Sequence, residues 1–190
     1  GMAGAPQRPT RGRRAEAAPP PGQQGLAIPV HGDVEPEILA LERAVLRVAI
    51  QRPALAGPAF DSLEPDAFRS PVYRAVREIV GKSGGCATQG GGPAWMTSLI
   101  DSADDEVGRQ VLGELAVEPI PADEAALPRY VESVVMRQHE VWVSRQLVTL
   151  QAKLQRTDPS EDTEAYNRLF SELMALEKHR RDLRERGLGG

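Results

Sequence analysis

The stretch from Asp123 to Arg156 constrains the fold of this chain most, because it contains no glycine and one proline, Pro128, near its start. Proline is tolerated in the first turn of a helix, so the stretch predicts one long helix. At about 100° per residue, its larger side chains fall on two nearly opposite sides. The first side has Leu127, Tyr130, Val131, Val134, Gln138, Val141 and Val148, and the second has Val143, Leu147, Leu150 and Leu154. The apolar stripe therefore changes face near residues 141–143, and the two halves should pack against different partners.

A further helix, ending near Arg186, is predicted after the sequence RTDPSED. Asp158 and Pro159 break the long helix, and Ser160 or Asp162 can cap the next one. Its stripe consists of Tyr166, Leu169, Phe170, Leu173, Leu176 and Leu183. Two helices joined by a short turn form an antiparallel hairpin. Each can bury only one side in that seam, so Phe170 and Met174 should stay partly exposed and mark a partner site. The alternative is a hairpin that folds back on the rest of the chain or self-associates.

The region before the long helix predicts a bundle of shorter helices. Residues 33–53 form an amphipathic helix, with Asp33 available as a cap, Pro36 in the first turn and Pro53 as its end. Its apolar face has Ile38, Leu41, Val45, Val48 and Ala49, and its opposite face has Glu42, Arg43 and Arg47.

After a proline-interrupted turn, Ser70 and Pro71 begin a second helix of the bundle. Two short helices, residues 93–103 and 105–116, follow a glycine-rich loop. Their predicted apolar positions are Trp95, Leu99, Ile100, Val107, Val111, Leu112 and Leu115. No stretch alternates with period two, so we predict an all-α fold: a helical bundle subdomain and a C-terminal antiparallel helical hairpin, joined by the long helix.

Residues 1–33 differ in composition from the rest of the chain. They carry Arg8, Arg11, Arg13 and Arg14 among proline, glycine and alanine, with almost nothing apolar to bury. This composition predicts a disordered basic linker, whose arginines are the one expected contact with nucleic acid, and a weak one. Gly1 before Met2 is interpreted as a cloning remnant. The predicted organisation is a linker over 1–33, a bundle over 34–142 and a hairpin over 143–190.

The sequence GKSGG at residues 81–85 resembles the end of a phosphate-binding loop. Such a loop needs a glycine five residues earlier, preceded by a strand, but Val76 stands there within a predicted helix. We therefore interpret Gly81 as a left-handed helix cap and residues 81–92 as a slack, mobile connector.

Other chemical sites find little support in the sequence. His31, His139 and His179 are scattered, Cys86 is the only cysteine, and the acidic run at residues 104–106 suits a helix start. No catalytic, cofactor or metal site is predicted. The net charge of −4 over 190 residues also lacks the large positive field of non-specific nucleic-acid binders. No apolar run approaches the length of a membrane span.

LERAVLRVAIQRP, DAFRSPVYRAVREIV, RYVESVVMRQHE and the terminal hairpin together resemble the C-terminal helicase-binding domain of bacterial replicative DNA primase, over about Ile38–Gly187. The resemblance implies a non-catalytic adaptor that docks onto the N-terminal collar of the hexameric replicative helicase. It would recruit RNA-primer synthesis to the replication fork, in the cytoplasm at the nucleoid. The zinc-binding domain and the magnesium-dependent polymerase core of such a primase would lie upstream. The alanine-, arginine- and glycine-rich composition suggests an actinobacterial source.

Candidate contacts follow from this resemblance. For the helicase they are Tyr166, Phe170, Leu173 and Met174 as apolar contacts and Arg180, Arg181 and Arg184 as a polar rim. In some family members the bundle also holds the acidic tail of single-stranded-DNA-binding protein. The corresponding surface here offers Arg43 and Arg47, although Ile38, Leu41 and Glu42 do not reproduce a strongly basic pocket.

Two alternatives remain at this stage. The N-terminal collar domain of the helicase has a similar bundle, but a motor domain would follow it, whereas this chain ends at RERGLGG after a proline-rich start. We therefore expect a C-terminal module of a longer protein. A small nucleotide-binding enzyme would require magnesium-dependent ATP binding that Lys82→Ala abolishes.

Overall fold

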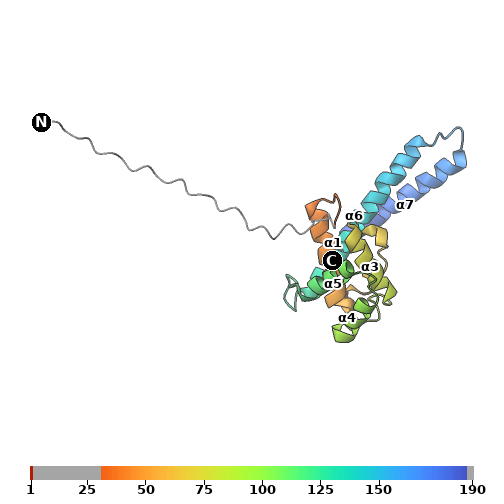
Figure 1. Cartoon of the computed structure of the whole chain (residues 1–190). Coiled ribbons are helices and arrows are strands. Elements are labelled where there is room, and N and C mark those ends of the chain that lie inside the picture. The colour runs from red at the N-terminus through yellow and green to blue at the C-terminus, as the bar shows by residue number, and fades with distance from the viewer. Residues whose placement is uncertain (2–30, 188–190) are drawn as a thin grey trace.

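The computed structural model describes Gly1 and residues 31–187, and over these residues it contains helices and no strand, as predicted (Figure 1). The helices are α1 (Pro36–Gln51), α2 (Pro53–Asp61), α3 (Pro71–Lys82), α4 (Gly92–Asp101), α5 (Glu106–Val117), α6 (Leu127–Arg156) and α7 (Thr163–Gly187), with a 3₁₀ turn, η1 (Pro65–Ala67), before α3. The predicted basic linker lies almost entirely outside the described residues. Within them, no helix combines the length and apolarity that crossing a membrane requires.

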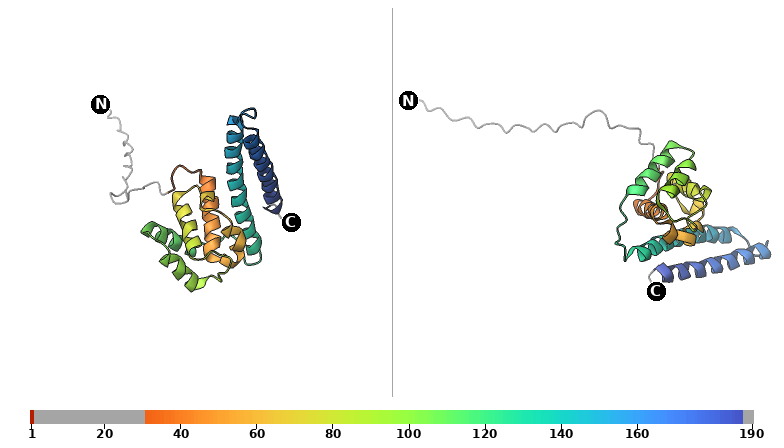
Figure 2. Two further views of the ribbon diagram at one scale, coloured as in Figure 1. Left: turned by 90° about the vertical axis from the view of Figure 1, so that its right-hand side faces the viewer. Right: turned by 90° about the horizontal axis from the view of Figure 1, so that it is seen from below.

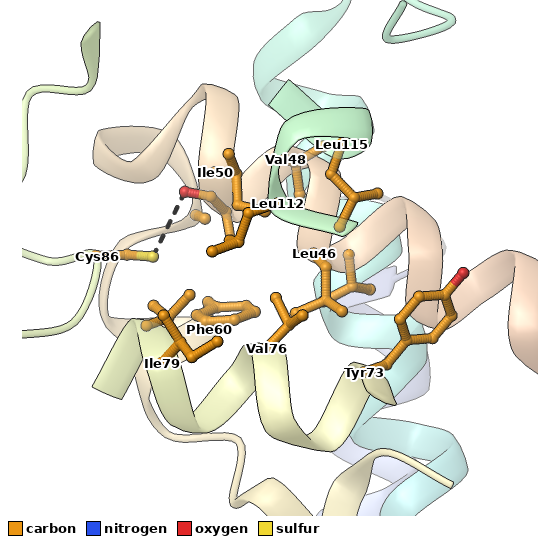
Figure 3. Packing of buried hydrophobic residues seen from close by; sticks show 14 of the residues in the cluster. Leu46, Val48, Ile50, Phe60, Tyr73, Val76, Ile79, Cys86, Leu112 and Leu115 are labelled. Carbon is orange, nitrogen blue, oxygen red and sulfur yellow. Dashed lines mark hydrogen bonds between the residues drawn. The ribbon is translucent and has the colours of Figure 1, made fainter. Parts of the chain in front are cut away.

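Helix α1 lies at the centre of the bundle, where α2, α3, α5 and the first half of α6 pack around it. Leu46, Val48 and Ile50 of α1 contact a common core with Phe60 of α2 and Leu112 of α5 (Figure 3). The predicted polar face of α1 is wrong in part, because Glu42 is fully buried and Arg47 is 8% exposed. A central helix has neighbours on all sides, so its charged residues must find partners inside the protein.

The predicted helix starts are confirmed at Ser70 but not at Asp33. The Ser70 hydroxyl accepts a hydrogen bond from the Tyr73 backbone N–H at 3.4 Å, at the start of α3. Helix α1 instead begins after Glu35, without a side-chain cap. Pro53 begins the short helix α2, which was not predicted. Proline suits the first position of a helix as well as the residue after the end of the preceding one, so Pro53 alone did not distinguish the two.

The glycine-rich segment, residues 81–92, was predicted to be a slack connector, but hydrogen bonds hold its first part in place. Helix α3 continues through Gly81, and the first residues with positive φ after it are Gly84 (φ 95°) and Gly85 (φ 78°). The Asp61 carboxylate accepts hydrogen bonds from the backbone N–H groups of Cys86 at 2.7 Å and Ala87 at 2.8 Å. A Cβ on Gly85 would lie 2.9 Å from that carboxylate, so glycine permits this close approach. The buried Cys86 thiol donates to the Ala49 carbonyl (Figure 3).

The predicted change of face along α6 is confirmed. Leu127, Val131 and Val135 belong to the bundle core, whereas Val143, Leu147 and Leu150 pack against Leu173 and Leu183 of α7. Figure 2 shows the second half of α6 and the antiparallel α7 extending beyond the bundle. Asp162, one of the two predicted caps, accepts a hydrogen bond from the Ala165 backbone N–H at the start of α7. The hairpin therefore projects instead of folding back on the bundle.

Three predicted apolar positions are exposed. Val148, in the second half of α6, is 67% exposed. Ile100 and Val107 are 43% and 47% exposed, since the short helices α4 and α5 each turn only one face to the core.

Candidate functional site

The apolar residues predicted on α7 separate into an exposed pair and a buried residue. Phe170 and Met174, 46% and 45% exposed, lie one helical turn apart on the flank of the hairpin, and Tyr166 is half-buried. Leu173 is 8% exposed and packs in the seam against Leu147 of α6. One residue corresponds to a rotation of about 100°, which turns Leu173 towards α6 and leaves Met174 outside. The structure therefore places Leu173 inside the hairpin instead of on its surface.

The three predicted rim arginines also have different environments. Arg181 is exposed and Arg180 is half-buried. Arg184 donates through Nε to Oε1 of Glu140 at 2.5 Å, and Arg137 donates to Oε2 of the same carboxylate at 2.9 Å. The bond from Arg184 joins the end of α7 to the middle of α6, and the bond from Arg137 lies within α6. Arg184 therefore links the base of the hairpin while its side chain remains 58% exposed.

The environment of Glu140 favours its charged form. Its side chain is 11% exposed, and burial by itself raises the pKa of a carboxyl. The hydrogen bond from Arg184 and the positive charges of Arg137 and Arg184 outweigh this effect and hold the pKa below its ordinary value. Glu140 is not among the residues predicted from the sequence, although the three-residue spacing from Arg137 to Glu140 is typical of an ion pair on one helix face.

A groove lies where the hairpin leaves the bundle. It encloses about 600 Å³ between the start of α1, the residues before α3, the middle of α6 and the end of α7. Its apolar lining includes Ile38, Val141 and Val148, and its basic lining consists of Arg69, Arg137, Arg145 and Arg184. These residues come from four separate segments of the sequence. Helix periodicity within one segment could not reveal the groove for that reason.

The charged residues around the groove lie close together. Arg145 donates to the backbone carbonyls of Asp66 at 3.2 Å and Ala67 at 3.4 Å. Burial lowers its pKa, and the positive charge of Arg69 lowers it further. Glu42 lies beneath the groove, where its carboxylate accepts from the backbone N–H groups of Arg69 at 2.5 Å and Ser70 at 3.1 Å. Burial nevertheless raises the pKa of Glu42.

Arg43 and Arg47 on α1 are both engaged with Glu118, which follows α5. The distances are 2.7 Å from Arg43 Nε to Oε2 and 2.6 Å from Arg47 Nη1 to Oε1. The two guanidinium groups also donate to the hydroxyls of Tyr73 and Tyr130, respectively. Neither arginine lines the basic groove. The structure therefore shows this pair as a link between α1 and α5.

The remaining chemical candidates have structural partners. Lys82 of the GKS sequence is the last residue of α3, and its Nζ lies 2.6 Å from an oxygen of the Asp104 carboxylate. Asp105 accepts from the Gly108 backbone N–H at 2.6 Å and so caps α5. His139 is buried against α2, with Nε2 at 2.7 Å from the Ala59 carbonyl, and burial lowers its pKa. Across residues 31–187, no three His, Cys, Asp or Glu side chains gather as metal ligands.

Comparison with known proteins gives consistent matches. A family model described as DNA primase DnaG DnaB-binding matches residues 42–169. The chain is 37% identical over 188 residues to the DNA primase of Mycobacterium tuberculosis (strain ATCC 25618 / H37Rv), which covers 99% of this chain and 28% of that protein. The DNA primase of Streptomyces coelicolor (strain ATCC BAA-471 / A3(2) / M145) is 32% identical over 163 residues, covering 79% and 24%. The chain thus spans less than a third of these primases.

A solved structure is also similar to this chain. The helicase binding domain of primase from Mycobacterium tuberculosis matches with a TM-score of 0.69 and 39% sequence identity. The match covers 80% of this chain and 94% of that domain. The similarity therefore extends over nearly the whole of an isolated helicase-binding domain.

Proposed function

The chain belongs to the DnaB-binding family of DNA primase DnaG, and on that premise we propose that its hairpin docks onto the N-terminal collar of the hexameric replicative helicase. Docking recruits the parent primase, a DNA-directed RNA polymerase, to the replication fork in the cytoplasm. Zinc and magnesium belong to the upstream domains of that parent. The domain itself is a non-catalytic adaptor. The matched family and relatives are primases, which disfavours both the helicase collar and a nucleotide-binding enzyme.

The exposed pair Phe170 and Met174 on the projecting hairpin carries this proposal. Apolar side chains exposed together on a protein surface favour a partner that covers them. Full burial of such a side chain contributes about 1.5–3 kcal/mol, and about half of each is still exposed in the free domain. Arg181 lies on the same flank of α7 and supplies a charged rim. Tyr166 and Arg180 are half-buried beside this surface and are proposed as secondary contacts.

The proposed contact with the tail of single-stranded-DNA-binding protein gains less support. Arg43 and Arg47 would have to exchange Glu118 for the carboxylates of the tail. That exchange replaces one ion pair with another, so its net gain is small. We therefore retain the helicase as the principal proposed partner.

The double substitution Phe170→Ala and Met174→Ala tests the proposal. Binding to the cognate hexameric helicase is measured by isothermal titration calorimetry, and we expect about 10- to 100-fold weaker affinity, because burial of the exposed halves of two such side chains is lost. Ile100→Ala on α4 is the matched control, because Ile100 is 43% exposed but belongs to the bundle. Full affinity of the double variant would contradict the proposal. So would undiminished binding after deletion of residues 159–190.

A further inference from the structure

The basic groove at the base of the hairpin has no role in the contact proposed above. Val141 and Val148 of α6 and Ile38 of α1 provide apolar surface within it. Val148 is 67% exposed, so the apolar part of the groove is open to a ligand. The volume of about 600 Å³ is sufficient for several side chains of a bound peptide.

The charge of the groove favours an acidic ligand. Four arginines line it, and Glu140 is the one acidic residue in its described lining. Glu140 is shared by Arg137 and Arg184, and Arg69 also pairs with Glu35 at the edge. Arg145 hydrogen-bonds only to backbone carbonyls among its described contacts; burial and then the positive charge of Arg69 lower its pKa, against the opposing charge of Glu42. A carboxylate at this place would therefore meet a guanidinium, that of Arg145, with no carboxylate partner among its described hydrogen bonds.

The groove lies on the same side of α7 as the exposed flank of the hairpin. At about 100° per residue, Phe170, Met174 and Arg184 of α7 fall within about 80° of one another. Arg184 lines the groove, so the exposed pair and the groove share one side of the hairpin. A partner seated on Phe170 and Met174 can extend along this side to the bundle without crossing the seam.

We propose that the groove is a second docking site for the helicase, which inserts an acidic segment carrying an apolar side chain. The carboxylates of that segment bind Arg145 and the neighbouring arginines, and its apolar side chain packs on Val141 and Val148. This inference rests on the proposed docking of the hairpin. Two contacts at separate positions along the hairpin would fix its orientation on the helicase, which one apolar patch could not do.

Substitution of Val148 tests the groove with little risk to the fold, because that side chain is largely exposed. Val148→Asp places a negative charge against the acidic ligand, and we expect at least a tenfold loss of affinity for the cognate helicase in calorimetry. Arg145→Gln should weaken binding in the same direction. The matched controls are Val117→Asp, an exposed valine at the end of α5, and Arg168→Gln, an exposed arginine of α7 outside the groove. Both controls should bind within twofold of the unchanged protein.

Photo-crosslinking separates this inference from the proposed function. A photoreactive amino acid replaces Val148 in one variant and Phe170 in another, and each is irradiated with the helicase. The inference is supported if both crosslink and the Val148 adduct maps to an acidic helicase segment. It is overturned, and the proposed function retained, if only Phe170 crosslinks and Val148→Asp binds normally. It is likewise overturned if Val148 crosslinks to single-stranded-DNA-binding protein but not to helicase. Absence of a complex with the unchanged domain would reject the proposed function itself.

Discussion

The bundle and the hairpin bury apolar surface in different ways. In the bundle, helices surround α1, and the side chains of Leu46, Phe60 and Leu112 are completely buried. In the hairpin, one seam between α6 and α7 buries Leu147, Leu173 and their neighbours, and the other sides of both helices face outwards. A two-helix seam cannot enclose a core. The hairpin is therefore the region that can offer apolar surface to a partner.

Polar contacts reinforce this difference. In the bundle, Arg77 donates to the backbone carbonyls of Leu63 and Asp61 and lies 5.1 Å from the centre of the Phe60 ring. In the hairpin, the main charged link is the carboxylate of Glu140 at the base. The bundle thus provides a rigid platform, and the hairpin is held mainly by its apolar seam and by the ion pairs of Glu140. Four experiments can test this contrast between the bundle and the hairpin.

The largest effect is expected for Phe60→Ala. Loss of a completely buried phenylalanine costs about 3–5 kcal/mol of unfolding free energy, because the rigid bundle cannot close the cavity. Urea unfolding followed by circular dichroism measures this change. Phe170→Ala is the matched control and should cost less than about 1 kcal/mol, as expected for a partly exposed site. Equal costs would contradict the distinction between core and hairpin surface.

A smaller and more local effect is expected for Leu173→Ala. The free energy of unfolding of the hairpin should fall by about 2–3 kcal/mol. This is at the lower end of values for buried leucines, because the two helices can move closer and partly fill the cavity. Hydrogen exchange measured by mass spectrometry should show faster exchange in α7 and in the second half of α6. Exchange in α1 should not change. Acceleration throughout α1 would show that the hairpin and the bundle unfold as one unit.

Asp61→Ala tests the hydrogen bonds by which Asp61 holds the glycine-rich segment, a contact within the bundle. Loss of the carboxylate leaves the N–H groups of Cys86 and Ala87 without their acceptor, at a cost of about 1–3 kcal/mol. Burial, followed by the charge of Asp61, raises the pKa of the Cys86 thiol to about 12, so it should react very slowly with Ellman's reagent at pH 8. The substitution should accelerate that reaction. Asp61→Asn keeps one acceptor oxygen and should have an intermediate effect. Unchanged reactivity of the Cys86 thiol in both Asp61 variants would mean that Asp61 does not hold the segment in place.

The smallest effect concerns pH and His139, which faces α2 from α6. Burial lowers its pKa below the ordinary 6.5, so the folded protein resists protonation. Its contribution to stability is complete above pH 6.5 and is lost as the pH falls through the lowered pKa. Urea midpoints should therefore decrease on acidification from neutral pH, and His139→Gln should reduce that slope. The raised pKa of Glu42 acts in the opposite direction in both proteins, so the difference between them isolates His139. Parallel slopes would contradict this assignment.

Much of the fold could be predicted because helices carry their own periodicity. Ser70 with Pro71, the long helix, its change of face and the hairpin all depend on residues three or four positions apart. The candidate site was predicted less completely. Phe170 and Met174 are exposed as expected, whereas Leu173 lies in the seam and Arg184 is bound to Glu140. Neighbouring positions on one helix can face different surroundings, and periodicity alone does not identify what lies opposite.

The sequence by itself determined an all-helical chain with two apolar surfaces on one long helix, because the spacing of side chains fixes the face on which each lies. Only the tertiary structure decided that Glu42 is buried, that Glu118 binds both Arg43 and Arg47, and that Asp61 pins the glycine-rich segment. It also created the basic groove from four separate segments. These features depend on distances between residues far apart in the chain, which are set only when the helices pack together.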